Sequence, residues 1–328
     1  MPVGKLLQHA ADLVLEFFAV GIYVSSIYIG AALLPAVLLL FWLLGPGSAT
    51  AWGLLAAFLA LSLTPLSLTT GALSERFVQF SCRRAAAYFP AGVVCEDAEA
   101  FRSDRGYVFG FCPHSALPVA LPLVFATNGP LLPKTLRGRT HGLASSACFV
   151  APLVRQLYWW LGVRPATREV MAGLLRERKV AVLVPGGVQE VLHMEHGKEV
   201  AYLSPRTGFV RMAIQHGAPL VPVWAFGQTR AYSWFRPGPP LVPTWLVARI
   251  SRTFGAVPIG IYGAYGTSMP HKEPMTVVVG RPIPVPDVQG EPPAELVREL
   301  LRRFMDELQA LYDKHKAKYG KGEELVIL

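Results

Sequence analysis

A single histidine follows a short apolar run that ends in a proline. Residues 107–111 are aromatic, β-branched or small, and Cys112, Pro113 and His114 come directly after them. In α/β sheets, ligands bind at the ends of strands and in the loops that follow. Histidine is also the side chain whose ordinary pKa allows proton exchange near neutral pH. The segment therefore predicts that His114 is a proton-transfer residue if the chain is an enzyme.

A second strand-like run, 180–184, continues with Pro185, two glycines and a carboxylate. Gly186 and Gly187 let the backbone approach a ligand closely and expose N–H groups. Glu190 could orient an imidazole or bind a polar head group. Either loop alone is a weak signal. Together they predict one site that holds a histidine, a glycine pair and a carboxylate.

A cation follows in the next segment. We expect a helix over residues 205–216, with Ser204 as its N-cap. Arg206 would then lie in the first helical turn, where a cation costs about 0.3–1 kcal/mol. An anion bound at the same place offsets this cost, because arginine and helix N-termini both recognise phosphate. The alternative is an ion pair with Glu195 or Glu199.

Other chemistries fit the residues less well. The sequence lacks the Gly-x-Ser-x-Gly elbow of serine hydrolases, a Walker loop and a dinucleotide-binding fingerprint. The segment His193-Met-Glu-His196 does not have the spacing of a zinc-protease helix, and we expect no metal. A thiol nucleophile at Cys112 is the remaining alternative, but residues so close in sequence rarely have the geometry for nucleophile activation.

The composition indicates a membrane-associated protein. Hydrophobic residues make up 52% of the 328 residues, charged residues 16%, and the mean hydropathy is +0.37. The net charge of +9 suits anionic lipid or a phosphorylated substrate, and no nucleic-acid-binding motif is present. The four cysteines show no Cys-x-x-Cys spacing, which agrees with a reducing, cytosol-facing compartment.

Residues 17–74 contain no Asp, Glu, Lys or Arg. A membrane-spanning helix needs about 20 apolar residues, so two spans fit, residues 17–44 and 50–68, joined by a Gly-Pro-Gly turn. Lys5 before them and Arg76 after them place both ends in the cytosol. We expect a cytosolic N-terminus over 1–16, a membrane hairpin over 17–74 and a cytosol-facing domain over 75–328. Pro35 leaves a re-entrant hairpin as the alternative.

The remainder alternates between strand-like and helical patterns, which predicts an α/β domain with a mixed sheet flanked by helices. Residues 229–274, rich in Trp, Pro, Gly and Tyr, suggest an irregular lid or a second membrane contact. The expected strands are 107–111, 180–184, 220–226 and 276–279, and the expected helices are 168–178, 205–216 and 293–319.

These segments together resemble the type-2 diacylglycerol acyltransferase family, in particular its plant and algal members. The resemblance covers nearly the whole chain. It rests on five blocks: Phe58-Leu59-Ala-Leu61, Tyr88-Phe-Pro90, Cys112-Pro-His114-Ser, Pro185-Gly-Gly-Val-Gln-Glu190 with His193-Met-Glu-His196, and a long block from Arg206-x-Gly-Phe-x-Arg211 through Val221-Pro222 to Phe226-Gly-Gln228. Cys112 departs from the His or Glu usual in the third block. Val119 stands where distant glycerolipid acyltransferases carry an Asp after their histidine.

The resemblance implies a glycerolipid-acyltransferase-like fold and transfer of an acyl group from coenzyme A to diacylglycerol, with acyl-CoA as co-substrate and no further cofactor. It implies an endoplasmic reticulum membrane location, with the lipid-droplet surface as a second one, and leaves a homo-oligomer open. His114 would act as the general base, and Glu190, in the absence of the Asp, would orient it. Substrate contacts are expected from Gly186, Gly187, His193, Arg206 and Arg211, and lipid contacts from Phe58, Leu59 and Leu61.

Three alternatives remain. The same chemistry could serve monoacylglycerol, or a long-chain alcohol in wax ester synthesis. A non-catalytic membrane lipid-binding protein is the alternative from another class, and it predicts saturable lipid binding without turnover.

Overall fold

The computed structural model describes residues 3–236, 242–243, 245–246, 249 and 259–328. Within them, the central sheet has the strand order β1-β10-β7-β2-β5-β3-β4. Strand β10 runs antiparallel to β7, and the other neighbours are parallel. The strands are β1 Gly92–Cys95, β2 Tyr107–Cys112, β3 Thr140–Ala144, β4 Arg164–Pro165, β5 Val180–Leu183, β7 Leu220–Phe226 and β10 Thr276–Val279.

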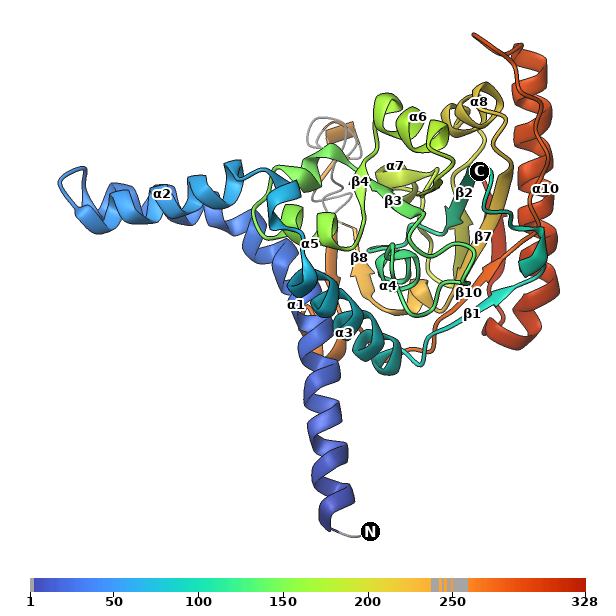
Figure 1. Cartoon of the computed structure of the whole chain (residues 1–328). Helices are drawn as coiled ribbons and strands as arrows, with labels where there is room; N and C mark the ends of the chain where they lie inside the picture. The colour runs from blue at the N-terminus through green and yellow to red at the C-terminus, as the bar shows by residue number, and fades with distance from the viewer. Residues whose placement is uncertain (1–2, 237–241, 244, 247–248, 250–258) are drawn as a thin grey trace.

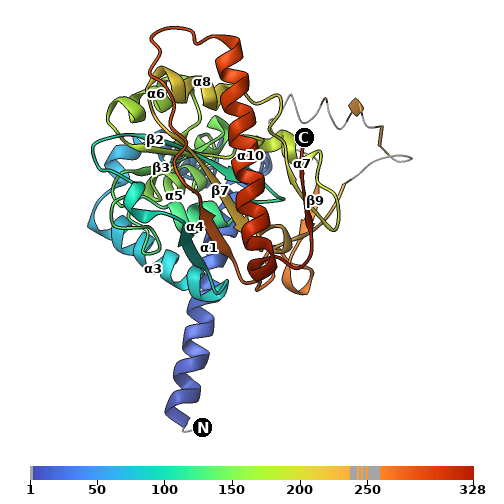
Figure 2. The same ribbon diagram turned by 90° about the vertical axis from the view of Figure 1, so that its right-hand side faces the viewer.

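Helices cover both faces of this sheet (Figures 1 and 2). Alternate residues of the buried strand β2 point to opposite sides, as the period of two in a strand requires. Phe109 and Phe111 pack toward α1, α3 and α4, whereas Val108 and Cys112 pack toward α6, α8 and α10. The helices are α1 Val3–Leu44, α2 Ala49–Leu63, α3 Ala72–Tyr88, α4 Ala120–Phe125, α5 Val154–Trp160, α6 Arg168–Arg176, α7 Gly187–Val191, α8 Gly208–Gln215 and α10 Ala294–Tyr319. The expected mixed sheet flanked by helices is confirmed.

The four predicted strands correspond to β2, β5, β7 and β10, and the predicted helices to α6, α8 and α10. The start of α8 was predicted wrongly. The helix begins at Gly208, its N-cap is Thr207 without a side-chain hydrogen bond, and Arg206 lies in the loop before it. The Ser204 N–H instead donates to the Leu328 carbonyl at 2.7 Å. The chain is thereby held in a turn where a helix start was expected.

A short parallel pair lies beside the central sheet and includes the last residues of the chain. Strand β11, Glu324–Ile327, pairs with β6, Lys198–Ala201. The Leu328 N–H donates to the Ala201 carbonyl at 2.9 Å, and the Leu328 carbonyl accepts from the Leu203 N–H at 2.8 Å. The final segment is therefore part of the folded domain.

The N-terminal helices project from this body. Helix α1 is bent in Figure 1, and Pro35, the proline within it, lacks the N–H of a regular helical bond. We call residues 36–63, which comprise the end of α1, the Gly-Pro-Gly turn and α2, the arm. The Phe41 and Trp52 rings meet edge to face at 5.1 Å, and the Trp52 indole N–H donates to the Pro46 carbonyl at 2.9 Å. These contacts hold the two helices together as a hairpin.

The helices show how the expected membrane segment is built. Helix α1 runs without a break from Val3 to Leu44, so the expected boundary between residues 16 and 17 lies within one helix and stays a prediction. Helix α2 ends at Leu63, before Pro65, and its 15 residues span only about 22 Å. This is shorter than the roughly 30 Å hydrocarbon core, so α2 alone does not cross a bilayer. Among the described residues, α1 is the helix long and apolar enough to do so.

Part of the predicted irregular region over 229–274 lies outside the described residues. Its described portion includes an antiparallel pair, β8 Ser233–Phe235 and β9 Gly260–Tyr262. The prediction of a lid there stays a prediction.

Candidate functional site

Three loops meet at one edge of the central sheet. Strands β5, β2 and β7 are parallel neighbours, so their carboxyl ends lie at the same edge. His114 follows β2, Glu190 follows β5 and Gln228 follows β7. We call residues 113–119 the His114 loop. The topology thus brings together two of the predicted residues and one that the sequence reading did not select.

The imidazole of His114 is held by its own chain. Its Nδ1 atom lies 2.9 Å from the Ser115 carbonyl oxygen. A carbonyl only accepts, so Nδ1 carries the proton and Nε2 keeps the basic lone pair in the neutral ring. Burial lowers the His114 pKa, and the bond to Ser115 opposes that shift in part. The ring is therefore neutral and basic at Nε2 near neutral pH.

The backbone of Ser115 explains how this carbonyl reaches the ring. Ser115 has a φ of +51°, in the left-handed region that favours glycine. The turn at Ser115 therefore supplies a carbonyl oxygen as the hydrogen-bond acceptor for the imidazole, where an acidic side chain was expected. No acidic residue is needed at position 119 for this purpose.

Glu190 does not orient the imidazole, which corrects the sequence-based expectation. One carboxylate oxygen accepts the backbone N–H of His114 in a short bond, and the other accepts the Tyr202 N–H at 2.9 Å. Burial raises the Glu190 pKa to about 7, while the two N–H donors and the nearby Arg206 act in the opposite direction. The buried carboxyl thus ties the His114 backbone to the segment that follows β6.

Gln228 holds the same loop from the other side. Its amide nitrogen donates to the Pro113 carbonyl in a short bond, and its amide oxygen accepts the Ala120 N–H at 3.0 Å. The side chain is almost fully buried, with 1% exposed. Glu190 and Gln228 therefore hold the Pro113–His114 peptide group, and Gln228 also holds the start of α4 at Ala120. The signal in the sequence was the polar residue two positions after the predicted strand 220–226.

The glycine pair and Arg206 form one compact turn. Arg206 donates from Nη2 to the Gly186 carbonyl at 2.6 Å, rather than pairing with Glu195 or Glu199. A Cβ on Gly186 would lie 2.2 Å from a Glu190 oxygen, so only glycine fits there. The Gly187 N–H donates to the Val184 carbonyl at 3.1 Å and is engaged within the loop.

The structure separates the two predicted arginines. Arg211 pairs with Glu291 across the surface of α8, away from the glycine turn. His193 lies nearer to Arg206, because both contact Tyr202: the His193 ring stacks on it at 4.6 Å, and the Arg206 guanidinium lies 5.4 Å from its centre. His193 and Arg206 are thus brought together, and Arg211 is not.

The Phe58-Leu59-Ala-Leu61 block lies on α2 in the arm, far along the chain from the strand ends. Leu59 and Leu61 are exposed, and Leu61 lines a cavity at the base of the arm. This position suits lipid contact, apart from His114.

Cys112 is fully buried in β2. Burial and the charge of Glu190 raise the pKa of its thiol well above the ordinary value. A protonated thiol is a poor nucleophile, so the geometry disfavours the thiol alternative.

A polar cavity of about 490 Å³ adjoins the His114 loop. Pro113, Ser115 and Ala116 line one side, and His196 and Lys198 are among the residues opposite. The His196 ring stacks on Trp234 at 4.1 Å. The cavity therefore offers both a flat aromatic surface and polar groups beside the site.

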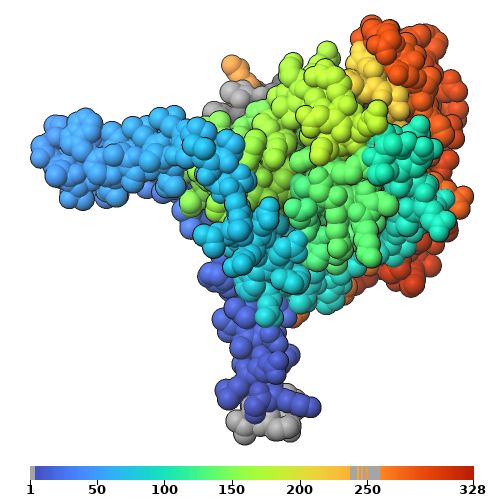
Figure 3. Space-filling view, in the orientation of Figure 1, coloured from blue at the N-terminus to red at the C-terminus, as the bar shows by residue number. Residues whose placement is uncertain are grey.

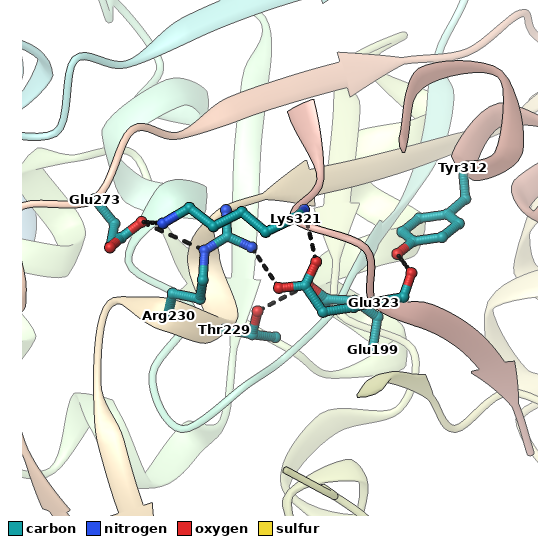
Figure 4. A network of polar contacts seen from close by, with 7 residues as sticks. All are labelled: Glu199, Thr229, Arg230, Glu273, Tyr312, Lys321 and Glu323. Atoms are coloured by element: carbon teal, nitrogen blue, oxygen red, sulfur yellow. Dashed lines mark hydrogen bonds and ion pairs between the residues drawn. The ribbon is translucent and has the colours of Figure 1, made fainter. Parts of the chain in front are cut away.

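A charged network borders this cavity (Figure 4). Arg230 pairs with Glu323 at 2.8 Å and with Glu273 at 3.3 Å. Thr229 donates to the buried Glu199 at 2.8 Å, and burial raises the Glu199 pKa to about 8. The network joins the loop after β7 to the segment that leads into β11.

Comparisons with known proteins identify the family of the chain. A sequence model of the family described as diacylglycerol acyltransferase matches residues 53–328. Acyl-CoA wax alcohol acyltransferase 2 of Mus musculus is 32% identical over 258 residues, 74% of this chain and 75% of that protein. Diacylglycerol O-acyltransferase 2 of Xenopus tropicalis is 30% identical over 71% of this chain and 66% of that protein. 2-Acylglycerol O-acyltransferase 1 of Bos taurus is 31% identical over 68% of this chain and 69% of that protein.

Among solved structures, the 1-acyl-sn-glycerophosphate acyltransferase of Thermotoga maritima aligns over 97% of this chain and all of its own. The TM-score is 0.46 and the identity 15%, values too low to support an inference.

Proposed function

Because the chain belongs to the diacylglycerol acyltransferase family, a family of acyltransferase enzymes, we propose that it esterifies diacylglycerol with an acyl group from acyl-CoA. The observation that carries this proposal is the His114 ring, whose Nδ1–H is held by the Ser115 carbonyl so that Nε2 is the free base. Glu190 and Gln228, from the two other strand-end loops, hold the peptide group between Pro113 and His114. A base held in this way suits removal of a proton from an alcohol.

The proposed reaction proceeds in one acyl transfer. Nε2 of His114 takes the proton of the acceptor hydroxyl as its oxygen bonds to the thioester carbonyl carbon. The carbon–sulfur bond then breaks, and the proton on Nε2 passes to the leaving thiolate, which gives free coenzyme A and the ester. The backbone N–H of Gly186 is the proposed donor to the oxyanion, since that of Gly187 is engaged. No covalent enzyme intermediate is required.

The acceptor is the finer part of the proposal. Relatives named for wax alcohol and 2-acylglycerol acyltransfer match this chain about as well as those named for diacylglycerol. A monoacylglycerol or a long-chain alcohol is therefore the second candidate acceptor. We also propose an endoplasmic reticulum membrane location, with the domain facing the cytosol, because the apolar α1 and the cations flanking the hairpin favour it.

The test is turnover by purified protein with labelled acyl-CoA and a panel of acceptors, with products identified by mass spectrometry. We expect triacylglycerol from wild type and a fall of about 10²–10⁴-fold in kcat for His114→Ala. Since burial lowers the His114 pKa, activity should decline on acidification only below the ordinary histidine value of about 6.5.

Cys112→Ser is the matched control, because it alters the neighbouring buried thiol and leaves the imidazole intact. It should retain activity. Near-wild-type turnover by folded His114→Ala would exclude the general-base role. Saturable lipid binding by wild type without turnover of any acceptor would exclude the proposed acyltransferase activity.

A further inference from the structure

Two adjacent apolar cavities lie where the arm joins the body. The larger, about 570 Å³, is enclosed by α1, α2, α5 and the start of α3. The smaller, about 50 Å³, lies between α1, α3, α4 and α5. Ile22, Phe77 and Leu157 line both, so the two spaces adjoin at these side chains.

Polar groups around the larger cavity are satisfied by the protein itself. Ser26, Thr64 and Gln156 each donate from the side chain to a main-chain carbonyl, at 2.7, 2.6 and 2.6 Å. The other lining side chains are mostly apolar. Cavities lined in this way hold water poorly and bind hydrocarbon.

The smaller cavity reaches the end of the His114 loop. Its lining includes Val119 and Leu123, at the end of the His114 loop and in α4. The opposite side of the same loop, at Pro113, Ser115 and Ala116, lines the polar cavity of about 490 Å³. Residues of the His114 loop therefore line both an apolar space, at Val119, and a polar one, at Pro113, Ser115 and Ala116.

We propose that the two apolar cavities hold a hydrocarbon chain of a lipid substrate, with its reacting end at His114 and its tail toward the arm. This inference rests on the proposed acyltransferase function and adds the place where one chain binds. Ile22, Phe77 and Leu157 would then set the length of chain that fits. The shared chemistry is a linear acyl chain, carried by either the acyl-CoA donor or the glyceride acceptor.

The experiment uses an opposed pair of substitutions, Ile22→Trp to narrow the passage and Ile22→Ala to widen it. Leu43→Trp is the matched control, because it adds the same ring at an exposed position of the same helix that lines neither cavity. Purified full-length proteins are assayed with octanoyl-, myristoyl- and oleoyl-CoA at a fixed acceptor. A second series of assays varies the acceptor from dioctanoylglycerol to dioleoylglycerol at a fixed donor.

We expect Ile22→Trp to lower kcat/KM for the longest chains at least tenfold relative to the shortest, since each displaced methylene weakens binding about fourfold. Ile22→Ala should shift the preference toward longer chains, and Leu43→Trp should change neither. If chain preference changes in the donor series, the cavities hold the acyl chain of acyl-CoA; if it changes in the acceptor series, they hold a chain of the glyceride. A uniform change across all chain lengths in both series, by both Ile22 variants, would overturn the proposal while leaving the acyltransferase function intact. An inactive wild type would instead overturn that function.

Discussion

At the scale of single residues, the site depends on two buried side chains that touch only backbone. Glu190 binds the His114 N–H and Gln228 binds the Pro113 carbonyl, so neither contacts the imidazole. Both act on where the ring is placed rather than on its proton. This division explains how the site functions with Val119 where an acidic residue would otherwise orient the histidine.

Gln228→Leu should lower kcat about 10- to 100-fold with little change in KM. Leucine has a similar volume but leaves the Pro113 carbonyl and the Ala120 N–H buried without partners, at about 1–3 kcal/mol each. Steady-state kinetics and thermal unfolding measure the two effects. Gln215→Leu is the matched control, because this glutamine of α8 bonds the Gly290 carbonyl away from the site.

Gln228→Glu distinguishes positioning from simple loss of stability. A protonated glutamate can still donate to the Pro113 carbonyl, whereas a carboxylate cannot. We expect the activity of this variant to fall as the pH rises through the pKa of the new carboxyl, over a range in which wild type is unchanged. Identical pH profiles for the two proteins would argue against a positioning role.

At the scale of elements, the parallel pair β6–β11 positions the backbone that binds Glu190. Strand β6 ends at Ala201, and the Tyr202 N–H next to it donates to Glu190. Leu328 bonds the backbone at Ala201, Leu203 and Ser204. The last residues of the chain therefore fix the backbone of residues 201–204, and this segment in turn binds the Glu190 carboxylate through the Tyr202 N–H.

Removal of residues 324–328 should lower kcat by at least tenfold, because the backbone after β6 loses the bonds that fix it. Glu324→Ala is the control, since it removes an exposed side chain of β11 and keeps the backbone ladder. Turnover and hydrogen exchange at residues 198–204 measure the outcome. A truncated protein with wild-type kcat and unchanged exchange would refute the bracing role.

At the scale of the whole molecule, apolar surface is concentrated on the N-terminal helices. The arm projects from the body in Figure 3, and Trp42 and Leu63 are 77% and 72% exposed. Such large exposed apolar surfaces mark membrane or protein contacts. Earlier in α1, Asp12 pairs with Arg84 at 2.6 Å and Glu16 with Lys272 at 3.1 Å.

The first turns of α1 are accordingly amphipathic. The acidic face is held against the body, and the other face exposes Leu7, Val14 and Phe18. This arrangement suits a helix at the bilayer interface, with the arm inserted and too short at α2 for a second full span. We therefore propose the re-entrant alternative, in which the arm enters the bilayer without crossing it.

Leu39→Lys in the arm should reduce partition into phosphatidylcholine vesicles by up to about a hundredfold, because a lysine in the hydrocarbon core costs roughly 2.5–3.5 kcal/mol. Tyr265→Lys is the matched control, as it places the same charge on the body at a side chain that is 96% exposed. Flotation of protein synthesised in the presence of vesicles measures the partition. Equal flotation of both variants would show that the arm does not enter the bilayer.

Local patterns along the chain were enough to predict four strands of the central sheet and the candidate residues that follow them. Hydrophobic runs bounded by Pro and Gly located β2, β5, β7 and β10, because such patterns are set by neighbours along the chain. The same runs placed His114, Glu190 and the glycine pair directly after strands, and the uncharged stretch over 17–74 indicated the membrane. The motif blocks identified the family before any contact was known.

Only the tertiary structure decided which atoms meet. The choice of the Ser115 carbonyl as the partner of His114 depends on one positive φ, and the role of Glu190 depends on the parallel pairing of β2 with β5. Gln228 and Leu328 reach the site from distant parts of the sequence. Contacts between residues this far apart follow from strand order and packing, which the local pattern of a sequence does not specify.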